Sequence, residues 1–192
     1  MGASCIYPLL GCSTRPHWLF GGTEIDSKSF EYARKNVVQN NLISRVRLLK
    51  TTCESRLIPL DALGIQHADF TICNPPFYTS KEEMLATFTT KSKPPSAVCT
   101  GADVEMVTDG GDAGFVLRMI EESKALRGRI QWYTSMLGKL QSVNIIVARL
   151  EELGIGNWAV ACLKAGHKTR RWAVGWSFDD LRPRNVSACI CE

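Results

Sequence analysis

The segment Asn74-Pro75-Pro76-Phe77 directly follows the apolar run 70–73 and carries groups suited to one type of reaction. The exocyclic amine of a base such as adenine is a poor nucleophile, because the lone pair on its nitrogen is delocalised into the ring. An amide oxygen and a backbone carbonyl that both accept hydrogen bonds from this amine favour its tetrahedral form and leave the lone pair free. Asn74 and the carbonyl of Pro75 can supply these acceptors. The segment therefore predicts methyl transfer to a planar amine.

The prolines and the phenylalanine of this segment would hold such an amine in place. Consecutive prolines fix their own φ angles and keep the residue before each out of helix, so we expect a rigid, extended loop with outward carbonyls. Phe77 would stack on the face of a base taken out of its helix or loop, and would align that base with a methyl donor. The alternative interpretation is a turn that ends a strand, followed by a core phenylalanine.

The composition is that of one globular domain. The chain has 192 residues, of which 45% are hydrophobic and 22% charged, so neither disorder nor a fibrous repeat is indicated. No uninterrupted apolar stretch approaches the ~20 residues of a membrane span, and we expect a soluble protein. A net charge of +4 is compatible with an anionic partner without indicating one. We expect the domain to cover residues 1–178 and a C-terminal tail to cover 179–192.

The cysteines and histidines do not form a recognisable metal-binding pattern. Most of the eight cysteines lie inside apolar segments, as at Cys5, Cys73 and Cys162. Without a signal peptide, this placement favours reduced, buried thiols over a disulfide framework. Cys189 and Cys191 lack the two-residue spacer of a zinc hairpin, and the three histidines are scattered. The sequence therefore predicts no metal site.

Apolar runs of strand length alternate with segments of helical periodicity, which is typical of a largely parallel sheet with helices on both faces. Asp26 is a candidate N-cap for the helix that follows it. Residues 78–111 show no clear periodicity and predict either a long loop that binds or closes over a substrate, or a merely mobile insertion. We expect helices over 4–10, 27–40, 112–126 and 142–153, and strands over 17–25, 46–50, 68–73, 129–137, 158–163 and 172–178.

An acidic residue follows a glycine turn at the spacing of a nucleotide site. In a doubly wound sheet, the ligand lies where the first strand turns into the first helix, and a carboxylate about 20 positions later accepts from the ribose hydroxyls. Glu24 stands at about that distance from Gly2. A glutamate at a strand end is ordinary by itself. A glycine turn, then an acidic strand end, then the Asn74 motif is, however, the order of elements in a class I methyltransferase. We therefore expect Gly2 and Glu24 in a donor site, with Asn74 bordering both donor and acceptor.

Further motifs accompany this order. They are Gly2-Ala3-Ser4-Cys5-Ile6-Tyr7-Pro8-Leu9-Leu10-Gly11, Thr23-Glu24, Lys35-Asn36-Val37 through Asn40-Asn41-Leu42, Cys73-Asn74-Pro75-Pro76-Phe77, Trp132-Tyr133 with Met136-Leu137-Gly138-Lys139, and Arg171-Trp172-Ala173 with Trp176-Ser177-Phe178. On these motifs the chain resembles the adenine-N(6) RNA methyltransferases that modify U6 small nuclear RNA, together with their ribosomal RNA relatives.

The resemblance implies a class I, Rossmann-like methyltransferase that uses S-adenosylmethionine and forms N(6)-methyladenosine in a structured RNA such as U6 snRNA. It implies that residues 74–77 bind and orient the target adenine, and that Ser4, Glu24 and Ser55 contact the donor. It also implies a nuclear location. No basic import signal in the sequence supports the nucleus over the cytoplasm.

The chain departs from this family at two places. The family opens its donor site with an apolar strand ending in Asp-Ile-Gly-Thr-Gly, whereas this chain starts at Met1-Gly2, so we expect the first strand of the sheet to be missing. Two neighbouring strands would then keep unpaired backbone groups, and one wall of the donor pocket would be absent. At Glu54 relatives carry a lysine, so no role of that lysine carries over.

Basic residues are concentrated in two segments that could flank one edge of the sheet. Lys91 and Lys93 lie in the long loop after the Asn74 motif, and Lys168, Arg170 and Arg171 lie before the last expected strand. Such residues neutralise RNA phosphates and give an affinity that depends on salt but largely not on sequence. A protein recognises the sequence and shape of an RNA through bases that are displayed from its loops. The resemblance also places RNA-binding residues in both segments. The alternative is a solvated, charged face.

Three functions stay open at this point. The first is methylation of adenine in RNA, in which the protein contributes orientation and hydrogen-bond acceptors rather than a strong general base. The same motif also serves protein glutamines and DNA bases, although the glutamine enzymes usually carry tyrosine where this chain has Phe77. The third is a catalytically impaired fragment that acts at most as an RNA-binding module, because its donor site is incomplete.

Overall fold

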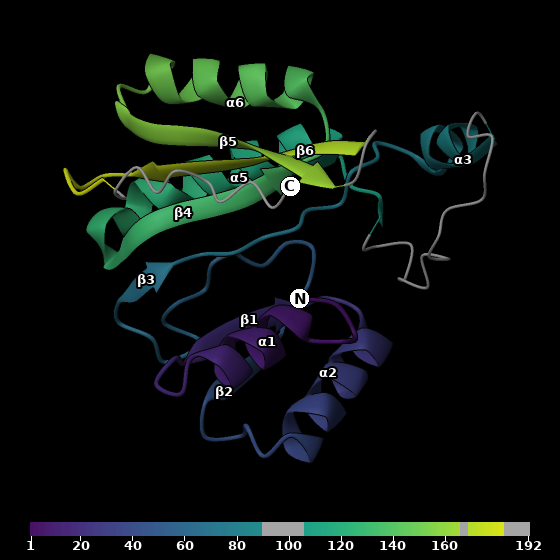
Figure 1. The fold of residues 1–192 in the computed structure, drawn as a ribbon, viewed down its shortest axis with the longest axis vertical. Helices are drawn as coiled ribbons and strands as arrows, with labels where there is room; N and C mark the ends of the chain where they lie inside the picture. The colour runs from purple at the N-terminus through teal and green to yellow at the C-terminus, as the bar shows by residue number, and fades with distance from the viewer. Residues whose placement is uncertain (90–105, 166–168, 183–192) are drawn as a thin grey trace.

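The structure, a computed structural model, describes residues 1–89, 106–165 and 169–182. Among these residues, no helix is long and apolar enough to cross a membrane. The elements follow one another (Figure 1) as α1 (Ile6–Thr14), β1 (Phe20–Glu24), α2 (Ser27–Gln39), β2 (Val46–Lys50), β3 (Ala68–Phe70), α3 (Lys81–Thr89), α5 (Gly111–Leu126), the 3-10 helix η1 (Arg127–Arg129), β4 (Ile130–Leu137), α6 (Leu140–Glu152), β5 (Asn157–Ala165) and β6 (Thr169–Ser177).

The strands form two groups in the described part of the chain. β1 and β2 pair in parallel, from Phe20 opposite Val46 to Glu24 opposite Lys50. The second group has the order β3-β4-β6-β5, in which β3 and β4 are parallel and β6 is antiparallel to both β4 and β5. The α/β fold is confirmed. Its last two strands depart from the largely parallel pattern, because a connection as short as the one between β5 and β6 joins only antiparallel neighbours.

β1 and β3 share no partner strand among the described residues. In Figure 1, β1 and β2 lie with α1 and α2 in the lower part of the molecule, and the other strands lie above them with α5 and α6. Each of β1 and β3 therefore has one edge paired and one edge open toward the gap between the groups.

The larger core lies between the four-stranded group and the helices α5 and α6, which contact each other. Tyr133 of β4 and Trp176 of β6 stack with ring centroids 5.6 Å apart, and both are fully buried. The indole N–H of Trp176 donates to Ser123 Oγ on α5 at 3.0 Å. Burying each large apolar side chain contributes about 1.5–3 kcal/mol, so this core is the main source of stability.

A smaller core packs α1 and α2 against β1 and β2, with Cys5, Ala33 and Val37 among its buried members. Asp26 caps α2 as predicted, because its carboxylate accepts from the Ser29 amide at 2.7 Å. Such a cap contributes about 1 kcal/mol.

Side chains from both strand groups hold the segment 51–67, which connects β2 to β3. The Arg47 guanidinium donates to the Gly64 carbonyl at 2.7 Å, and the Glu122 carboxylate accepts from the Leu57 amide at 2.9 Å. The connection therefore depends on charged side chains that bond to backbone rather than on a strand ladder. These side chains are Arg47 from β2, Arg118 and Glu122 from α5, and Arg129 from η1.

β3 ends at Phe70, earlier than predicted, because a side chain takes over part of its pairing. The Thr134 amide donates to Thr71 Oγ1 at 2.8 Å in place of a main-chain carbonyl. The backbone nevertheless continues along β4, where the Met136 amide donates to the Cys73 carbonyl at 2.8 Å. The chain is thus still tied to the sheet at the residue before the Asn-Pro-Pro-Phe segment.

The helix α3 occupies part of the stretch that was predicted to be a loop. Ser80 caps it, since its Oγ accepts from the Glu83 amide at 3.2 Å. Glu82 and Glu83 lie in the first turn, where carboxylates favour the positive end of the helix dipole. The Ser80-x-x-Glu83 spacing is a capping-box pattern, and it is the sequence signal that predicts this helix. Residues 90–105 lie outside the described part of the chain.

The Glu83 carboxylate also joins the start of α3 to the turn after β4. It makes an ion pair with Lys139 Nζ at 2.7 Å, and it accepts from the Thr79 amide at 2.8 Å and from the Thr79 hydroxyl at 2.7 Å. The hydrogen bond from Lys139, followed by those from Thr79, lowers the pKa of Glu83 to about 2. This contact is called the Glu83 clasp below.

We expect the Glu83 clasp to make stability depend on pH in the acid range. Because the pKa of Glu83 is lower in the folded state than its ordinary value of 4.5, the contribution is complete above that value and is lost as the pH falls toward 2. The measurement compares the free energy of unfolding of the wild type and Glu83→Gln at about pH 7 and about pH 2.5.

The difference between the two proteins should be largest near neutral pH and should shrink in acid. Glu151→Gln is the matched control, because Glu151 is an exposed glutamate on α6. Its effect should be small at either pH. A Glu83→Gln difference of constant size across this range would contradict the clasp.

Candidate active site

The acceptor segment, residues 74–77, leaves the sheet beside β4 and presents its first side chain to solvent. The Thr71 amide donates to the Trp132 carbonyl at 2.9 Å, and this bond with the one at Cys73 fixes the backbone just before Asn74. Asn74 is exposed. Its side-chain amide makes no hydrogen bond within the described residues, so its oxygen is available to accept one from a ligand.

The rest of the acceptor segment is held by its surroundings. Pro75 is fully buried and fixes the backbone on which the Asn74 side chain is carried. Phe77 is half-buried and belongs to neither hydrophobic core. Its ring lies against Gly138 on one side, where an added Cβ would be 2.8 Å from Cδ1, and the Arg171 guanidinium lies 5.4 Å from its centroid.

Glu24 lies at the end of β1, where the sequence predicts a ribose acceptor, but both of its carboxylate oxygens already accept backbone hydrogen bonds. Oε1 accepts from the amides of Ile25 at 2.9 Å and Asp26 at 3.0 Å. Oε2 accepts from the Gly2 amide at 2.8 Å and lies 3.5 Å from the Met1 amino nitrogen. The side chain is buried, with 5% of Glu24 exposed.

The hydrogen bonds around Glu24 determine whether its carboxylate can accept from the ribose of a donor. A carboxylate has about four acceptor positions, and the four nitrogens around Glu24 use them. The residue type suits a ribose diol. The hydroxyls would bind, however, only after Met1 and Gly2 turn away from Oε2.

Of the other predicted donor residues, Gly2 bonds to Glu24, whereas Ser4 and Ser55 make no hydrogen bond to Glu24 in the described part of the chain. Gly2 has a φ of 72°, a conformation that favours glycine, and its carbonyl accepts from the Cys5 amide at 3.2 Å. Ser4 is exposed. Ser55 lies in the connecting segment, where its Oγ accepts from the Thr52 amide at 3.0 Å.

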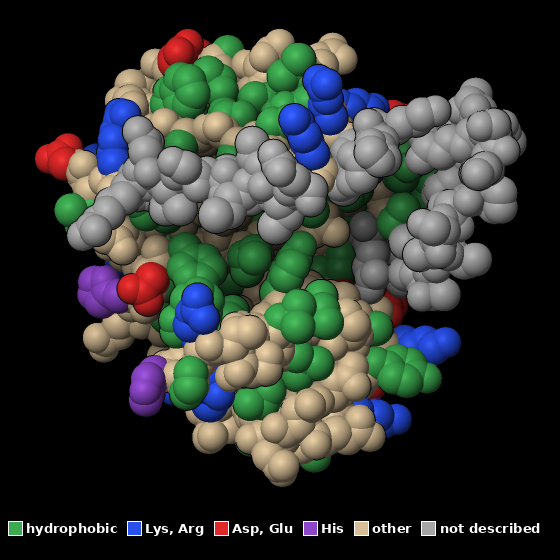
Figure 2. Space-filling view, viewed as in Figure 1, with side chains coloured by type: hydrophobic (Ala, Val, Ile, Leu, Met, Phe, Trp, Pro, Cys, Tyr) green, Lys and Arg blue, Asp and Glu red, His purple; other side chains and the backbone are tan. Residues whose placement is uncertain are grey.

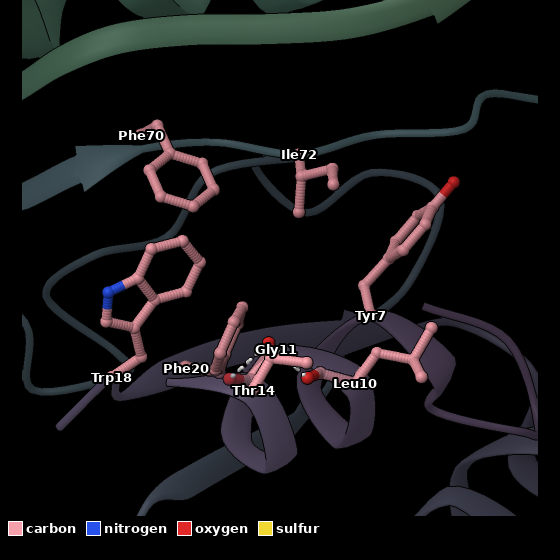
Figure 3. A pocket seen from close by; sticks show the side chains of 8 residues that line it. All are labelled: Tyr7, Leu10, Gly11, Thr14, Trp18, Phe20, Phe70 and Ile72. Carbon is pink, nitrogen blue, oxygen red and sulfur yellow. Dashed lines mark hydrogen bonds between the residues drawn. The ribbon is translucent and has the colours of Figure 1, made fainter. Parts of the chain in front are cut away.

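A groove of about 200 Å³ opens between the two strand groups (Figure 3). Trp18 and Phe70 meet edge to face across it with centroids 5.3 Å apart. In Figure 2, hydrophobic side chains gather in the hollow between the two parts of the molecule. The predicted donor residues are not part of its lining, which consists of Tyr7, Leu10, Gly11, Thr14, Trp18, Phe20, Phe70 and Ile72. It is therefore a mostly apolar groove between α1, the start of β1 and the end of β3.

Two of the predicted RNA-binding residues can be placed. Arg170 is exposed near the start of β6, and its neighbour Arg171 approaches the Phe77 ring. A basic side chain therefore does lie beside the acceptor segment. Lys91, Lys93 and Lys168 lie outside the described residues.

Sequence reasoning assigned no role to the residues that support Phe77. Gly138 and Lys139 belong to a motif of the family resemblance, yet nothing in their spacing indicates contact with residues some 60 positions earlier. The pairing of β4 with the segment 71–73 brings them together. A glycine directly after a long apolar strand was the available signal.

Comparison with known proteins shows which family the chain resembles. The sequence profile of an RNA methyltransferase family matches residues 1–180. The "U6 small nuclear RNA (adenine-(43)-N(6))-methyltransferase" of Schizosaccharomyces pombe is 46% identical over 184 residues, which cover 96% of this chain and 46% of that protein.

Solved structures agree with the profile. The human Mettl16 catalytic domain in complex with MAT2A 3'UTR hairpin 1 has a TM-score of 0.83 and 40% identity, covering 93% of this chain and 62% of that chain. The N-terminal domain of human METTL16 in complex with SAH has a TM-score of 0.71 and 36% identity, covering 93% of this chain and 59% of that one. This chain thus spans less than two thirds of each of these relatives. Since the profile covers nearly all of it, the chain belongs to this RNA methyltransferase family.

Proposed function

We propose that this chain methylates the exocyclic N6 of adenosine in a structured RNA, with S-adenosylmethionine as the methyl donor. The observation that carries the proposal is the Asn74 amide, which is exposed and unpaired among the described residues, at the end of a backbone fixed by β4. The relatives support the choice of substrate, because one is named for adenine in U6 small nuclear RNA and another was solved with an RNA hairpin.

The acceptor segment activates the amine by accepting its hydrogen bonds. Asn74 Oδ1 is exposed and accepts from one N–H of the adenine amine. Pro75 is fully buried, contrary to the expected outward carbonyls, so its carbonyl would accept from the other N–H only after the segment shifts to uncover it. The two bonds together favour a tetrahedral nitrogen with an available lone pair. The bound donor supplies an electrophilic sulfonium methyl. The nitrogen forms the new N–C bond as the methyl–sulfur bond breaks, and the surplus proton on nitrogen passes to solvent. Buried Pro75 fixes the backbone that carries Asn74, so little reorganisation of the Asn74 side chain is needed on binding.

Phe77 and Arg171 offer a surface for the base. A purine that stacks on Phe77 gains about 1–3 kcal/mol by aromatic stacking. With its guanidinium 5.4 Å from the ring centroid, Arg171 occupies one face of Phe77, and a base entering there must displace it. The displaced cation remains close to the phosphates of the same nucleotide. Arg170, exposed next to it, would contribute further salt-dependent affinity.

A second function follows from the network around Glu24. If Met1 and Gly2 do not leave the carboxylate, the donor does not bind, and the chain acts as an RNA-binding module. The hydrogen bond from the Gly2 amide at 2.8 Å favours this alternative. Methylation of a protein glutamine or a DNA base uses the same acceptor chemistry. An assay that compares RNA, DNA and peptide substrates distinguishes these functions from the proposed one.

Transfer of tritiated methyl groups to three substrates tests the acceptor class. We expect label on an adenosine-containing RNA hairpin and little on duplex DNA or on a glutamine-containing peptide, since the Asn74 site is beside basic residues that bind phosphate and the relatives are named for RNA. Label on the peptide alone would exclude RNA as the substrate.

We predict that Asn74→Ala lowers methyl transfer by about 100-fold or more while RNA affinity changes less than about threefold, because the amide acts on the reacting amine and not on phosphates. Transfer is measured under single-turnover conditions, and affinity by fluorescence anisotropy. Asn40→Ala is the matched control, since Asn40 is an exposed asparagine that bonds only within α2. Equal losses of transfer and affinity would contradict the role given to Asn74.

Calorimetry with S-adenosylhomocysteine tests the donor side. We expect measurable binding to the wild type and at least about tenfold weaker binding to Glu24→Gln, because the amide offers one acceptor oxygen instead of two for the ribose hydroxyls. The exposed Glu151→Gln substitution should leave binding unchanged. No heat at millimolar ligand would show that this chain does not use the donor and would favour the RNA-binding alternative.

A further inference from the structure

A buried carboxylate lies behind the acceptor segment. Asp112 is in the first turn of α5 and is only 4% exposed. It accepts from the Gly138 amide at 2.6 Å and from the Ser142 hydroxyl at 2.7 Å. Gly138 lies in the turn between β4 and α6, and Ser142 lies in the first turn of α6. Asp112 therefore ties the start of α5 to the start of α6 and to the turn before it.

The Gly138 end of this contact meets Phe77. A Cβ added to Gly138 would lie 2.8 Å from Phe77 Cδ1 and 3.3 Å from Asp112 Oδ2. Gly138 is not among the glycines with positive φ. Its lack of a side chain therefore serves close packing: the ring rests on the Gly138 backbone, and the Asp112 carboxylate holds that backbone from behind.

The same helix also contacts the backbone of Phe77. A Cβ on Gly111, the residue before Asp112, would be 3.3 Å from the Phe77 carbonyl oxygen. The first turn of α5 thus supports Phe77 at its carbonyl directly and at its ring through Gly138.

The burial of Asp112 needs a reason beyond stability. Removing a carboxylate from water costs several kcal/mol, and the helix N-terminus and two hydrogen bonds offset this cost without a clear net gain. A buried polar group whose hydrogen bonds are all satisfied does, however, select one arrangement of its neighbours among the several that apolar packing alone would allow. Here the geometry that it fixes is the position of Gly138 beside the Cδ1 and Cε1 atoms of the Phe77 ring.

We propose that Asp112 is a positioning residue for the acceptor base. By holding Gly138 it sets the plane of Phe77, and by setting this plane it sets the angle at which a stacked adenine presents its amine to the methyl donor. The inference rests on the proposed function, because the base is the ligand that makes the orientation of Phe77 matter. Asp112 touches neither substrate nor donor and acts through Gly138 and Phe77.

Four variants separate this role from a general structural one. Asp112→Ala removes the support. Asp112→Asn can restore it, because its amide oxygen accepts from Gly138 while its NH2 group donates to the Ser142 oxygen. Gly138→Ala keeps the carboxylate but pushes on the ring. Ser123→Ala is the matched control, since it removes a buried hydrogen bond from the same helix, the one to Trp176, far along α5 from Phe77.

Two readouts are measured on the complete chain. The first is the 19F NMR signal of 4-fluorophenylalanine placed at position 77, which reports the surroundings of the ring without any methyl transfer. The second is the split between kcat and KM for the RNA hairpin. A displacement of the ring by about 1 Å is enough to lower kcat about 100-fold.

We expect Asp112→Ala and Gly138→Ala to shift or broaden the 19F signal and to lower kcat by about 10- to 100-fold, with KM for RNA within about threefold of the wild type. Asp112→Asn should recover most of both values. Ser123→Ala should lower thermal stability but leave the signal and kcat near those of the wild type.

An unchanged 19F signal in both Asp112→Ala and Gly138→Ala would overturn the proposal, and so would a loss in Ser123→Ala equal to that in Asp112→Ala. If Asp112→Ala fails to fold, Gly138→Ala and Asp112→Asn still decide the matter. Absence of methyl transfer by the wild type would count against the proposed function. The 19F comparison would then still show whether Asp112 positions Phe77.

Discussion

The hydrogen bonds between the segment 71–73 and β4 are the constraint on which the acceptor site depends. Thr71 and Cys73 bond to Trp132 and Met136, and the side chain of Thr71 takes the place of a main-chain partner between them. A slip of one residue along this boundary would turn every following side chain to the other face. The exposure of Asn74 and the burial of Pro75 both follow from this register.

The same boundary determines what lies behind the acceptor segment. Because β4 runs parallel to β3, the turn that ends β4 emerges beside the end of the segment 71–73. Gly138 therefore lies close to Phe77, and Lys139 pairs with Glu83, which also accepts from Thr79. The carboxylates Asp112 and Glu83 thus hold this turn from two different helices. These contacts join residues from four stretches of the chain. A rigid acceptor site thus requires the larger core to be folded.

The sequence predicted the local features of this structure and missed contacts between distant residues. The Asp26 cap and the strand 46–50 were predictable because capping and apolar patterning act over a few residues. The early end of β3 was not, since a Thr71 side chain replacing a ladder bond leaves no periodic signal. Asn74 was singled out from its motif, and the structure places it at the surface. Its support by Asp112 was not, because no local pattern links residues whose contact arises only from the pairing of β3 with β4.

The donor side is organised by short-range contacts instead, and this makes it the more adjustable half of the site. Glu24 bonds to the next two residues along the chain and to Gly2, which belongs to the turn before α1. Two ribose hydroxyls replacing the Met1 and Gly2 nitrogens at Oε2 would exchange one pair of hydrogen bonds for another, at little net cost in hydrogen bonding. What the exchange costs is the reordering of two residues, about 1–2 kcal/mol each. For two residues this penalty amounts to about 2–4 kcal/mol, which weakens donor affinity by about 30-fold to about 700-fold. It leaves the acceptor half unaffected, because the residues that hold Phe77 make no contact with Glu24 among the hydrogen bonds of the described chain.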